Sequence, residues 1–179
     1  MTYVVRPAEM NDLDDLVNLS AHTPIGMSNL PRDKKRLKKE IEHSIEIFQT
    51  KVSPPKNMLY LFVMEETKTH DIVGMCGIWG ITGKELPYFS YVKEIEKRKT
   101  GDQETLNLIH KITGPSEICS LYLVPELRHA GLGKMLSFSR FLYIATFPDQ
   151  FTDQIMAVIQ GVTLDESYTP FWEEVGKKF

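Results

Sequence analysis

The amino-acid sequence predicts an α/β fold of the α+β kind, in which a mixed and mostly antiparallel sheet is flanked by helices. Three observations lead to this prediction. Short apolar runs of strand length alternate with longer segments that carry apolar residues at helical spacing. Two of the apolar runs are joined by a polar turn, which is typical of an antiparallel hairpin. A third run leads through a loop with two glycines into a long apolar helix.

The N-terminal part of the chain predicts a strand and two helices. Tyr3–Arg6 is a short strand, and the helix that follows it has apolar residues on one face. After a loop over His22–Pro31, Asp33–Gln49 forms a second amphipathic helix. Its basic run, Arg32–Lys39, is interpreted as a solvated helix face, with a contact to an acidic cofactor as the alternative.

The remaining elements follow in the order hairpin, insertion, strand, helix, strand, helix. Met58–Glu65 and Ile72–Ile81 form the hairpin, and residues 83–114 form an insertion whose charged part is expected to be mobile. A chain of 179 residues is expected to fold as a single domain, residues 1–179. The last four elements are predicted over Ser116–Val124, Leu132–Phe147, Gln154–Val162 and Ser167–Val175.

The composition argues against several classes of protein. A formal net charge of -3 does not suit a dedicated nucleic-acid surface. Cys76 and Cys119 lie in apolar runs without metal-ligand spacing, so we expect reduced, buried thiols, no metal site and a cytoplasmic location. The most hydrophobic helix, Met135–Phe147, is too short to span a membrane and contains Arg140, so no membrane association is expected.

The most informative stretch is the loop between the third apolar run and the long helix. Gly131 and Gly133 allow a ligand to approach the backbone closely, and the first amides of the helix have no acceptor within the helix. The helix dipole, Arg128 and Lys134 add positive potential at the same place. An anion is therefore the expected occupant, with an ordinary strand-to-helix turn as the alternative.

Two other phosphate-binding motifs do not fit this loop. A Walker loop needs Ser or Thr after its Gly-Lys pair, where this chain has Met135. A dinucleotide-binding fingerprint needs a third glycine, where this chain has Leu136. The Arg-x-x-Gly-x-Gly spacing instead resembles motif A of the GCN5-related N-acetyltransferase superfamily, which implies that the anion is the pyrophosphate of acyl-coenzyme A. The predicted order of elements matches that superfamily up to, but without, its final two strands.

Separate segments in the right order along nearly the whole chain resemble the arginine N-succinyltransferase family. This resemblance implies transfer of a succinyl group from succinyl-CoA to the α-amine of arginine, and sometimes ornithine. Family members run to about twice this length, so the chain resembles their N-terminal half. The segments are Val5–Pro7, Gly26–Pro31, Val73–Cys76, Pro87–Tyr91, Thr113–Leu123, Ser137–Phe141, Gly161–Val162 and Ser167–Glu173.

The resemblance also implies where the acyl-CoA binds. Leu121 stands where the family has its cofactor-binding leucine, and a plain core residue is the alternative. In the superfamily fold this strand is splayed at its end, so its free backbone groups can bind the amide-rich pantetheine arm. The candidate acyl-CoA site comprises Leu121, Tyr122, Leu123, Arg128, His129, Gly131, Gly133 and Lys134.

Candidates for the chemistry are fewer. Glu117 stands where superfamily members often keep a carboxylate that accepts the amine's proton through water, and an exposed strand-end glutamate is the alternative. Trp172 stands where many of them have a tyrosine that acts as the general acid for the departing thiolate. Because an indole cannot supply that proton, Tyr168 is the substitute. The family's proton-donor histidine has no counterpart here, and Gln160 replaces an arginine that the family usually carries.

Two functional hypotheses follow, besides a protein-interaction module that has lost its ligand. One is an amine-directed acyltransferase, and the other is a non-catalytic acyl-CoA-binding or regulatory subunit. Without the final strands the sheet would have an unpaired edge, which favours pairing with another chain. We therefore expect a homodimer or a second chain that completes the sheet.

Overall fold

The computed structural model describes most of the chain. The described residues are 2–23, 31–50, 52–83, 88–97, 101–111, 113–128, 131–159, 169–174 and 176–178. Within these ranges, none of the helices combines the length and the apolar character needed to cross a membrane.

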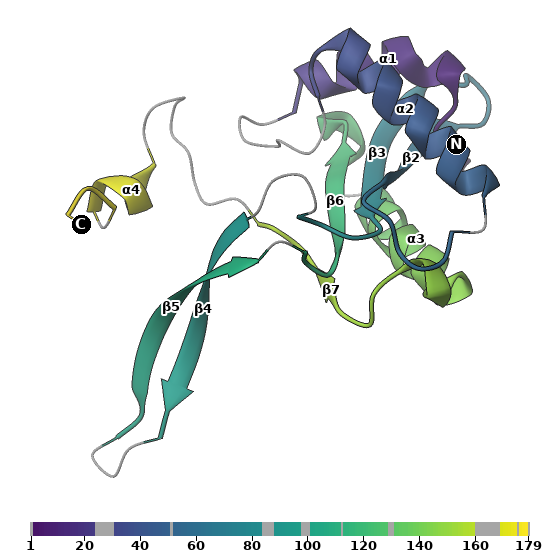
Figure 1. Cartoon of the computed structure of the whole chain (residues 1–179). Helices are drawn as coiled ribbons and strands as arrows, with labels where there is room; N and C mark the ends of the chain where they lie inside the picture. The colour runs from purple at the N-terminus through teal and green to yellow at the C-terminus, as the bar shows by residue number, and fades with distance from the viewer. Residues whose placement is uncertain are drawn as a thin grey trace.

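The centre of the fold is a five-stranded sheet in the order β1-β2-β3-β6-β7 (Figure 1). The first four strands in this order pair antiparallel with their neighbours, and β7 pairs with β6 in parallel. The prediction of a mixed, mostly antiparallel sheet is therefore confirmed. The strands are β1 (Tyr3–Pro7), β2 (Leu59–Glu66), β3 (Ile72–Trp79), β6 (Ser116–Leu123) and β7 (Ile155–Met156).

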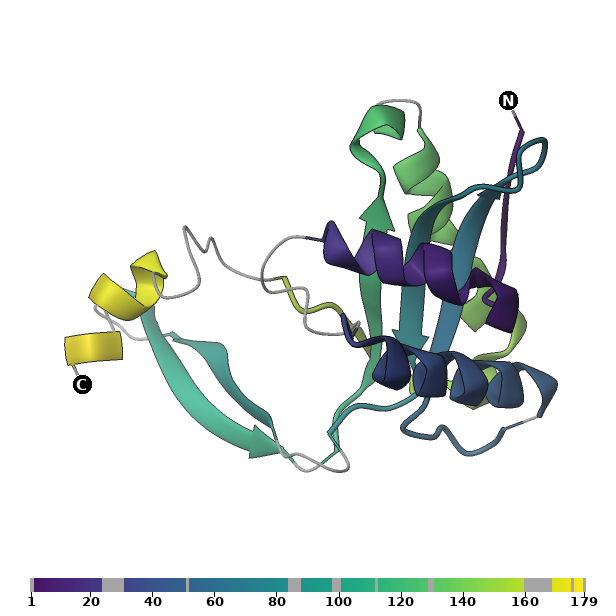
Figure 2. The ribbon, with the colours of Figure 1, turned by 90° about the horizontal axis from the view of Figure 1, so that it is seen from above.

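Helices cover both faces of this sheet. They are α1 (Leu13–Ala21), α2 (Lys34–Gln49) and α3 (Leu132–Thr146). The short α4 (Pro170–Glu174) lies apart from the sheet (Figure 1). Figure 2 shows α1 and α2 on one face and α3 on the other. Because strand side chains alternate between faces, Leu61 and Val63 join the core under α1 and α2, whereas Tyr60 and Phe62 join the core under α3.

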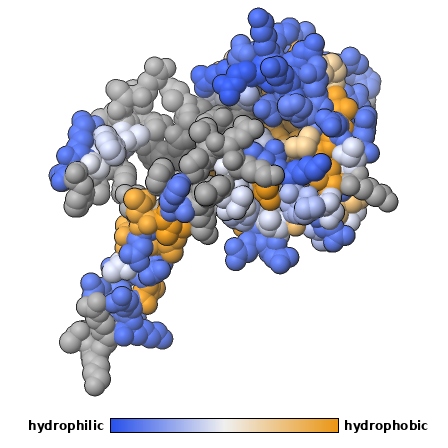
Figure 3. Space-filling model, viewed as in Figure 1, coloured by the Kyte–Doolittle hydropathy of each residue, from blue (hydrophilic) through white to orange (hydrophobic). Residues whose placement is uncertain are grey.

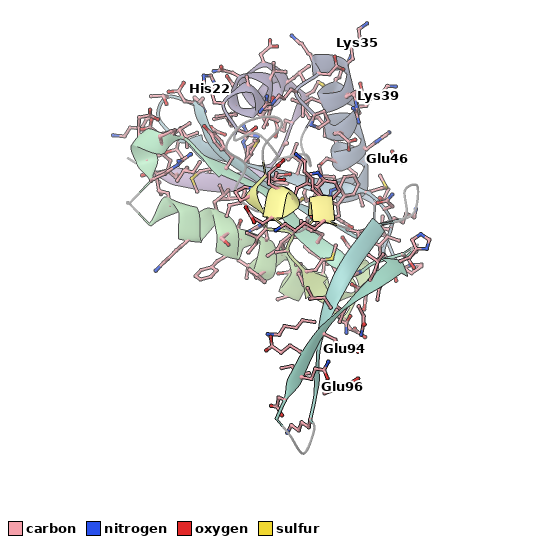
Figure 4. All side chains as sticks on the ribbon, turned by 90° about the vertical axis from the view of Figure 1, so that its left-hand side faces the viewer. His22, Lys35, Lys39, Glu46, Glu94 and Glu96 are labelled. Carbon is pink, nitrogen blue, oxygen red and sulfur yellow. The ribbon has the colours of Figure 1, made fainter. Side chains whose placement is uncertain are left out.

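The basic run on α2 lies on the outer face of the helix. Asp33 caps the helix by accepting a hydrogen bond from the Arg36 amide at 2.9 Å. Lys35 and Lys39 are exposed and point away from the body (Figure 4). Their positions agree with the interpretation of a solvated helix face.

The insertion is more regular than predicted. Its charged part forms a long antiparallel hairpin of β4 (Tyr88–Glu96) and β5 (Gln103–Lys111), which projects from the body (Figures 1 and 2). Apolar residues gather on this hairpin (Figure 3), and Leu106 and Leu108 are 64% and 58% exposed. Of the charged stretch, Lys93–Glu96 and Gln103–Glu104 pair as strands, and its mobility stays a prediction.

Among the described residues, the last elements cover less of the chain than predicted. Within the described part of Gln154–Val162, residues 154–159, only the two residues of β7 form a strand, and within the described part of Ser167–Val175, residues 169–174, the helix comprises Pro170–Glu174. β7 therefore extends β6 only at its beginning.

Candidate functional site

The glycine turn has the geometry of an anion cradle. Gly131 caps α3 with φ 80°, a left-handed conformation that favours glycine. The amides of Lys134 and Met135 both donate to the Gly131 carbonyl, at 3.1 and 3.2 Å. The amides of Leu132 and Gly133 precede these bonds and lie at the positive end of the helix dipole. A Cβ atom at Gly131 or Gly133 would have no atom within 4 Å, so the turn faces open space.

Two cations flank this turn. Lys134 is exposed in the first turn of α3, and Arg128 is exposed at the end of the short turn η2 (Pro125–Leu127). Arg128 Nε donates to the Leu123 carbonyl at 3.1 Å, and the guanidinium carbon lies 5.7 Å from the centre of the Tyr122 ring. These contacts hold one positive charge at the point where β6 ends and the loop begins. The candidate His129 lies outside the described residues.

β6 contains a bulge beside this turn. Gly77 of β3 pairs with Cys119 and Met75 pairs with Tyr122, so three steps along β6 match two steps along β3. Ser120 lies inside the bulge with φ 52°, which is uncommon for a residue other than glycine. The bulge interrupts the alternation of side chains between the two faces of the sheet. As a result, Cys119 and Tyr122, three residues apart, belong to the same core.

The bulge turns one side chain outward. Leu121 is 39% exposed, whereas Ser120 and Tyr122 on either side are each 5% exposed. Leu121 is therefore not a plain core residue. Tyr122 and Leu123 are buried, so along the strand only their backbone groups are available to a ligand. Their assignment to the acyl-CoA site stays a prediction.

Within the part of the chain that the structure describes, the edge of β6 that faces away from β3 has no partner strand after its first two residues. Among the described residues, β6 pairs with β7 only at Ser116 and Glu117, which lie opposite Ile155 and Met156. From Ile118 onward the two strands diverge. This agrees with the expectation of a splayed strand, and the divergence begins directly before the bulge.

Glu117 lies inside the sheet. Its relative exposure is 7%, and it is paired with Trp79 of β3 on one side and Met156 of β7 on the other. The alternative of an exposed strand-end glutamate is wrong, because β7 covers this position. The candidate Tyr168 and the replaced arginine position, Gln160, lie outside the described residues. Trp172, on α4, is 55% exposed.

The two cysteines are free and buried. Burial raises the pKa of the Cys76 thiol and that of the Cys119 thiol to about 12 each. Both are therefore protonated at neutral pH, which removes the thiolate that a nucleophile requires. No group of His, Cys, Asp and Glu among the described residues could hold a metal ion.

Sequence reasoning did not single out Arg140, which lies buried beside the bulge. This arginine of α3 is only 3% exposed, and desolvation lowers its pKa from the ordinary value. Its Nη1 donates to the Cys119 carbonyl at 3.3 Å, and its other groups bind Ser137 of the preceding turn. A signal was present in the sequence, because Arg140 follows the apolar Leu136 by four residues and so shares its inward face.

Comparisons with known proteins identify the family of this chain. The family model described as "Arginine N-succinyltransferase beta subunit" matches residues 3–179. The arginine N-succinyltransferases of Escherichia coli O6:K15:H31 (strain 536) and Enterobacter sp. (strain 638) are 35% and 36% identical over 98% of this chain. The match covers 53% of each of them, so the chain spans about half the length of the curated relatives it matches.

Solved structures give the same result. Arginine/ornithine succinyltransferase subunit AI from Pseudomonas aeruginosa is 30% identical, with a TM-score of 0.83 over 98% of this chain and 55% of that chain. Glucosamine-6-phosphate N-acetyltransferase from Arabidopsis thaliana is 12% identical, with a TM-score of 0.51 over 98% of this chain and 91% of that chain, and shares the fold. Because the family model matches residues 3–179, nearly the whole chain, this chain belongs to the arginine N-succinyltransferase beta subunit family.

Proposed function

We propose that this chain forms the acyl-CoA-binding part of an acyltransferase that transfers a succinyl group from succinyl-CoA to the α-amine of arginine or ornithine. The observation that carries the proposal is the turn of Gly131 and Gly133 at the start of α3, which follows β6 and η2 along the chain. Membership of the family supports the choice of reaction. The Pseudomonas aeruginosa relative is itself named for arginine and ornithine.

The proposed donor lies along the open edge of β6. Its pyrophosphate accepts hydrogen bonds from the amides of Leu132 and Gly133, and Arg128 and Lys134 balance its charge. The pantetheine arm follows β6 as an added strand, since its amides match the spacing of free backbone groups. The thioester then reaches the bulge beside Leu121.

The chemistry requires a proton acceptor and a donor to the developing oxyanion. The neutral amine attacks the thioester carbon, a C–N bond forms and the C–S bond breaks. Glu117 accepts the amine's proton through water, and a backbone amide of the bulge donates to the thioester oxygen. The departing thiolate takes up a proton, for which Tyr168 is the proposed donor.

A second polypeptide is part of this proposal. The chain spans about half the length of its relatives, β7 covers only the beginning of β6, and α3 exposes large apolar side chains on its outer side. These surfaces favour a homodimer or a second chain that completes the sheet. We also propose a cytoplasmic location, which the two free, buried thiols support.

Calorimetric titration with succinyl-CoA, acetyl-CoA and free CoA tests the donor site. We expect saturable binding with a preference for succinyl-CoA, and loss of at least roughly tenfold in affinity in Gly131→Val, because a branched side chain cannot adopt φ 80° without strain. Gly101→Val is the matched control, since Gly101 also has a positive φ, 120°, but lies beside the hairpin far from the cradle in the chain. Equal effects of the two substitutions, or no binding by the unmodified chain, would refute the donor site.

A turnover assay distinguishes the acyltransferase from the alternative, a non-catalytic acyl-CoA-binding subunit. CoA release from succinyl-CoA is measured with arginine, with ornithine and with neither amine. Amine-dependent release supports an acyltransferase. Binding of succinyl-CoA without amine-dependent release by the chain, alone or mixed with a second copy or a second chain, supports the regulatory subunit.

A further inference from the structure

The buried cation at Arg140 has no acidic partner among the described residues. Its hydrogen bonds go to the Ser137 carbonyl, the Ser137 hydroxyl and the Cys119 carbonyl. Burying a charged group without a counterion is costly, so neutral acceptors must hold it. The neighbouring thiols of Cys76 and Cys119 are protonated at neutral pH and supply no negative charge. A role as one half of a buried ion pair with these groups is therefore excluded.

Only one of these hydrogen bonds leaves the helix. The contacts with Ser137 lie within one turn of α3, whereas Nη1 reaches across to β6 at 3.3 Å. Its acceptor is the carbonyl of Cys119, and that carbonyl belongs to the peptide group that leads into Ser120. Arg140 thus holds one end of the bulge from the side of α3.

The bulge needs such a restraint. Ser120 has φ 52°, a backbone conformation that residues other than glycine rarely adopt. Such a conformation persists only when the surrounding structure fixes it. The rotation of the Cys119–Ser120 peptide plane decides the direction of the amides that follow. Leu121, the residue after Ser120, is the one that the bulge exposes. The direction of the backbone at the exposed point of β6 therefore depends on the contact with Arg140.

We propose that Arg140 is a positioning residue: through the Cys119 carbonyl it fixes the β6 bulge so that a bulge amide can donate to the thioester oxygen of the acyl donor. This inference rests on the proposed function, because it assigns a task to the same acyl-CoA site. Arg140 itself does not touch the donor in this arrangement. The residue acts on recognition of the thioester, and it leaves the pyrophosphate cradle at Gly131 unchanged.

The test compares two ligands that differ at the thioester. Calorimetric titration gives Kd for succinyl-CoA and for free CoA, which has no acyl carbonyl. In Arg140→Met we expect the preference for succinyl-CoA over CoA to fall roughly five- to tenfold, which corresponds to one hydrogen bond. The affinity for CoA should stay within about threefold, because the cradle is intact. Arg140→Lys, which keeps one buried donor, should recover part of the preference.

Two further variants keep the test decisive. Ser137→Ala removes the hydroxyl contact of the same guanidinium but leaves the bond to Cys119, so it should keep the preference of the unmodified chain. Arg140→Gln, whose side chain is too short to span to β6, replaces Arg140→Met if the latter does not fold. Circular dichroism checks folding in each case.

The outcomes separate this inference from the function on which it rests. An unchanged preference in Arg140→Met and Arg140→Gln overturns the inference while the acyl-CoA site stands. A parallel loss of affinity for both ligands, or the same loss of preference in Ser137→Ala, also overturns it, because the role is then only structural. If the unmodified chain binds neither ligand, the proposed function fails and the inference falls with it.

Discussion

Burial decides which single residues of this chain can take part in chemistry. Cys119 lies next to the bulge, where a nucleophile would be well placed, yet desolvation raises its thiol pKa to about 12. Glu117, three residues earlier than Ser120, is also buried but lies where β6 and β7 begin to diverge. The carboxylate is therefore the better candidate for proton transfer, and the thiols serve as apolar packing.

The raised thiol pKa values predict how stability depends on pH. Their folded values, about 12, lie above the ordinary value of 9.0, so both thiols are protonated in the folded and unfolded chain below pH 9. Their contribution to stability is complete there and is lost as the pH rises from 9 to 12. The free energy of unfolding should fall in this window by at most about 1.4 kcal/mol per pH unit for each thiol.

Urea unfolding at pH 8 and pH 10.5 measures this effect. Other groups also titrate at high pH, so the comparison is with Cys76→Ala/Cys119→Ala, which should show a smaller loss of stability between the two pH values. The same loss in both proteins would contradict the assignment to the thiols.

Residues that follow ordinary rules were predictable, and the strained ones were not. The glycines at 131 and 133 predicted a turn at the start of α3, because few residues other than glycine tolerate the left-handed conformation found at Gly131. The bulge gave no such signal, since Ser120 stands where glycine or asparagine would be expected at φ 52°. The buried contact of Arg140 with Cys119 also depends on tertiary packing, which no local pattern reports.

At the scale of elements, the hairpin of β4 and β5 stands apart from the sheet. Among the described residues, its backbone hydrogen bonds are made between its own two strands, and an isolated bridge between Thr82 and Gly114 closes its base. Figure 4 shows Glu94 and Glu96 on the part of the hairpin that projects from the body. Among the hairpin residues whose side chains the structure describes, none belongs to the two cores under the helices.

Removal of the hairpin should therefore leave the sheet folded. We expect a chain with residues 88–111 replaced by a short Gly-Ser linker to melt within roughly 4 °C of the unmodified chain, equivalent to about 1 kcal/mol. Circular dichroism melting provides the measurement. As a contrast, Leu61→Ala in the core should lose about 2–5 kcal/mol. Loss of cooperative melting on removal of the hairpin would mean that it supports the core.

Element types were predictable where periodicity was strong, and element ends were not. The two amphipathic helices and the hairpin of β2 and β3 follow from spacing alone. β7 is shorter than its apolar run suggested, because pairing with β6 stops after two residues. The β4–β5 hairpin was hidden by its charged residues, which interrupt the apolar pattern of a strand in the sequence.

At the scale of the whole molecule, α3 is apolar on both sides. Leu136 packs against the sheet, while Phe138 and Leu142, four residues apart, are 64% and 71% exposed on the outer face. A helix that is apolar all round is usually covered by further protein. This is the feature of the chain that departs most clearly from an isolated soluble domain.

Light scattering at increasing concentration should therefore report a mass above the 20.6 kDa of one chain. Phe138→Glu/Leu142→Glu should shift the chain toward the monomer, because a buried, unpaired carboxylate opposes association. Leu106→Glu/Leu108→Glu, on the hairpin, is the control with equally exposed leucines. A well-behaved monomer at high concentration would count against the homodimer and leave a second chain as the partner.

The pairing of β3 with β6 also gives the protein an optical probe. Trp79 lies directly opposite Glu117 in the antiparallel register, so the two side chains are on the same face of the sheet. The chain has only one other tryptophan, Trp172, so in Trp172→Phe all tryptophan emission comes from Trp79. Fluorescence of that variant would then follow, in real time and without a label, any molecule or proton that reaches the surroundings of Glu117.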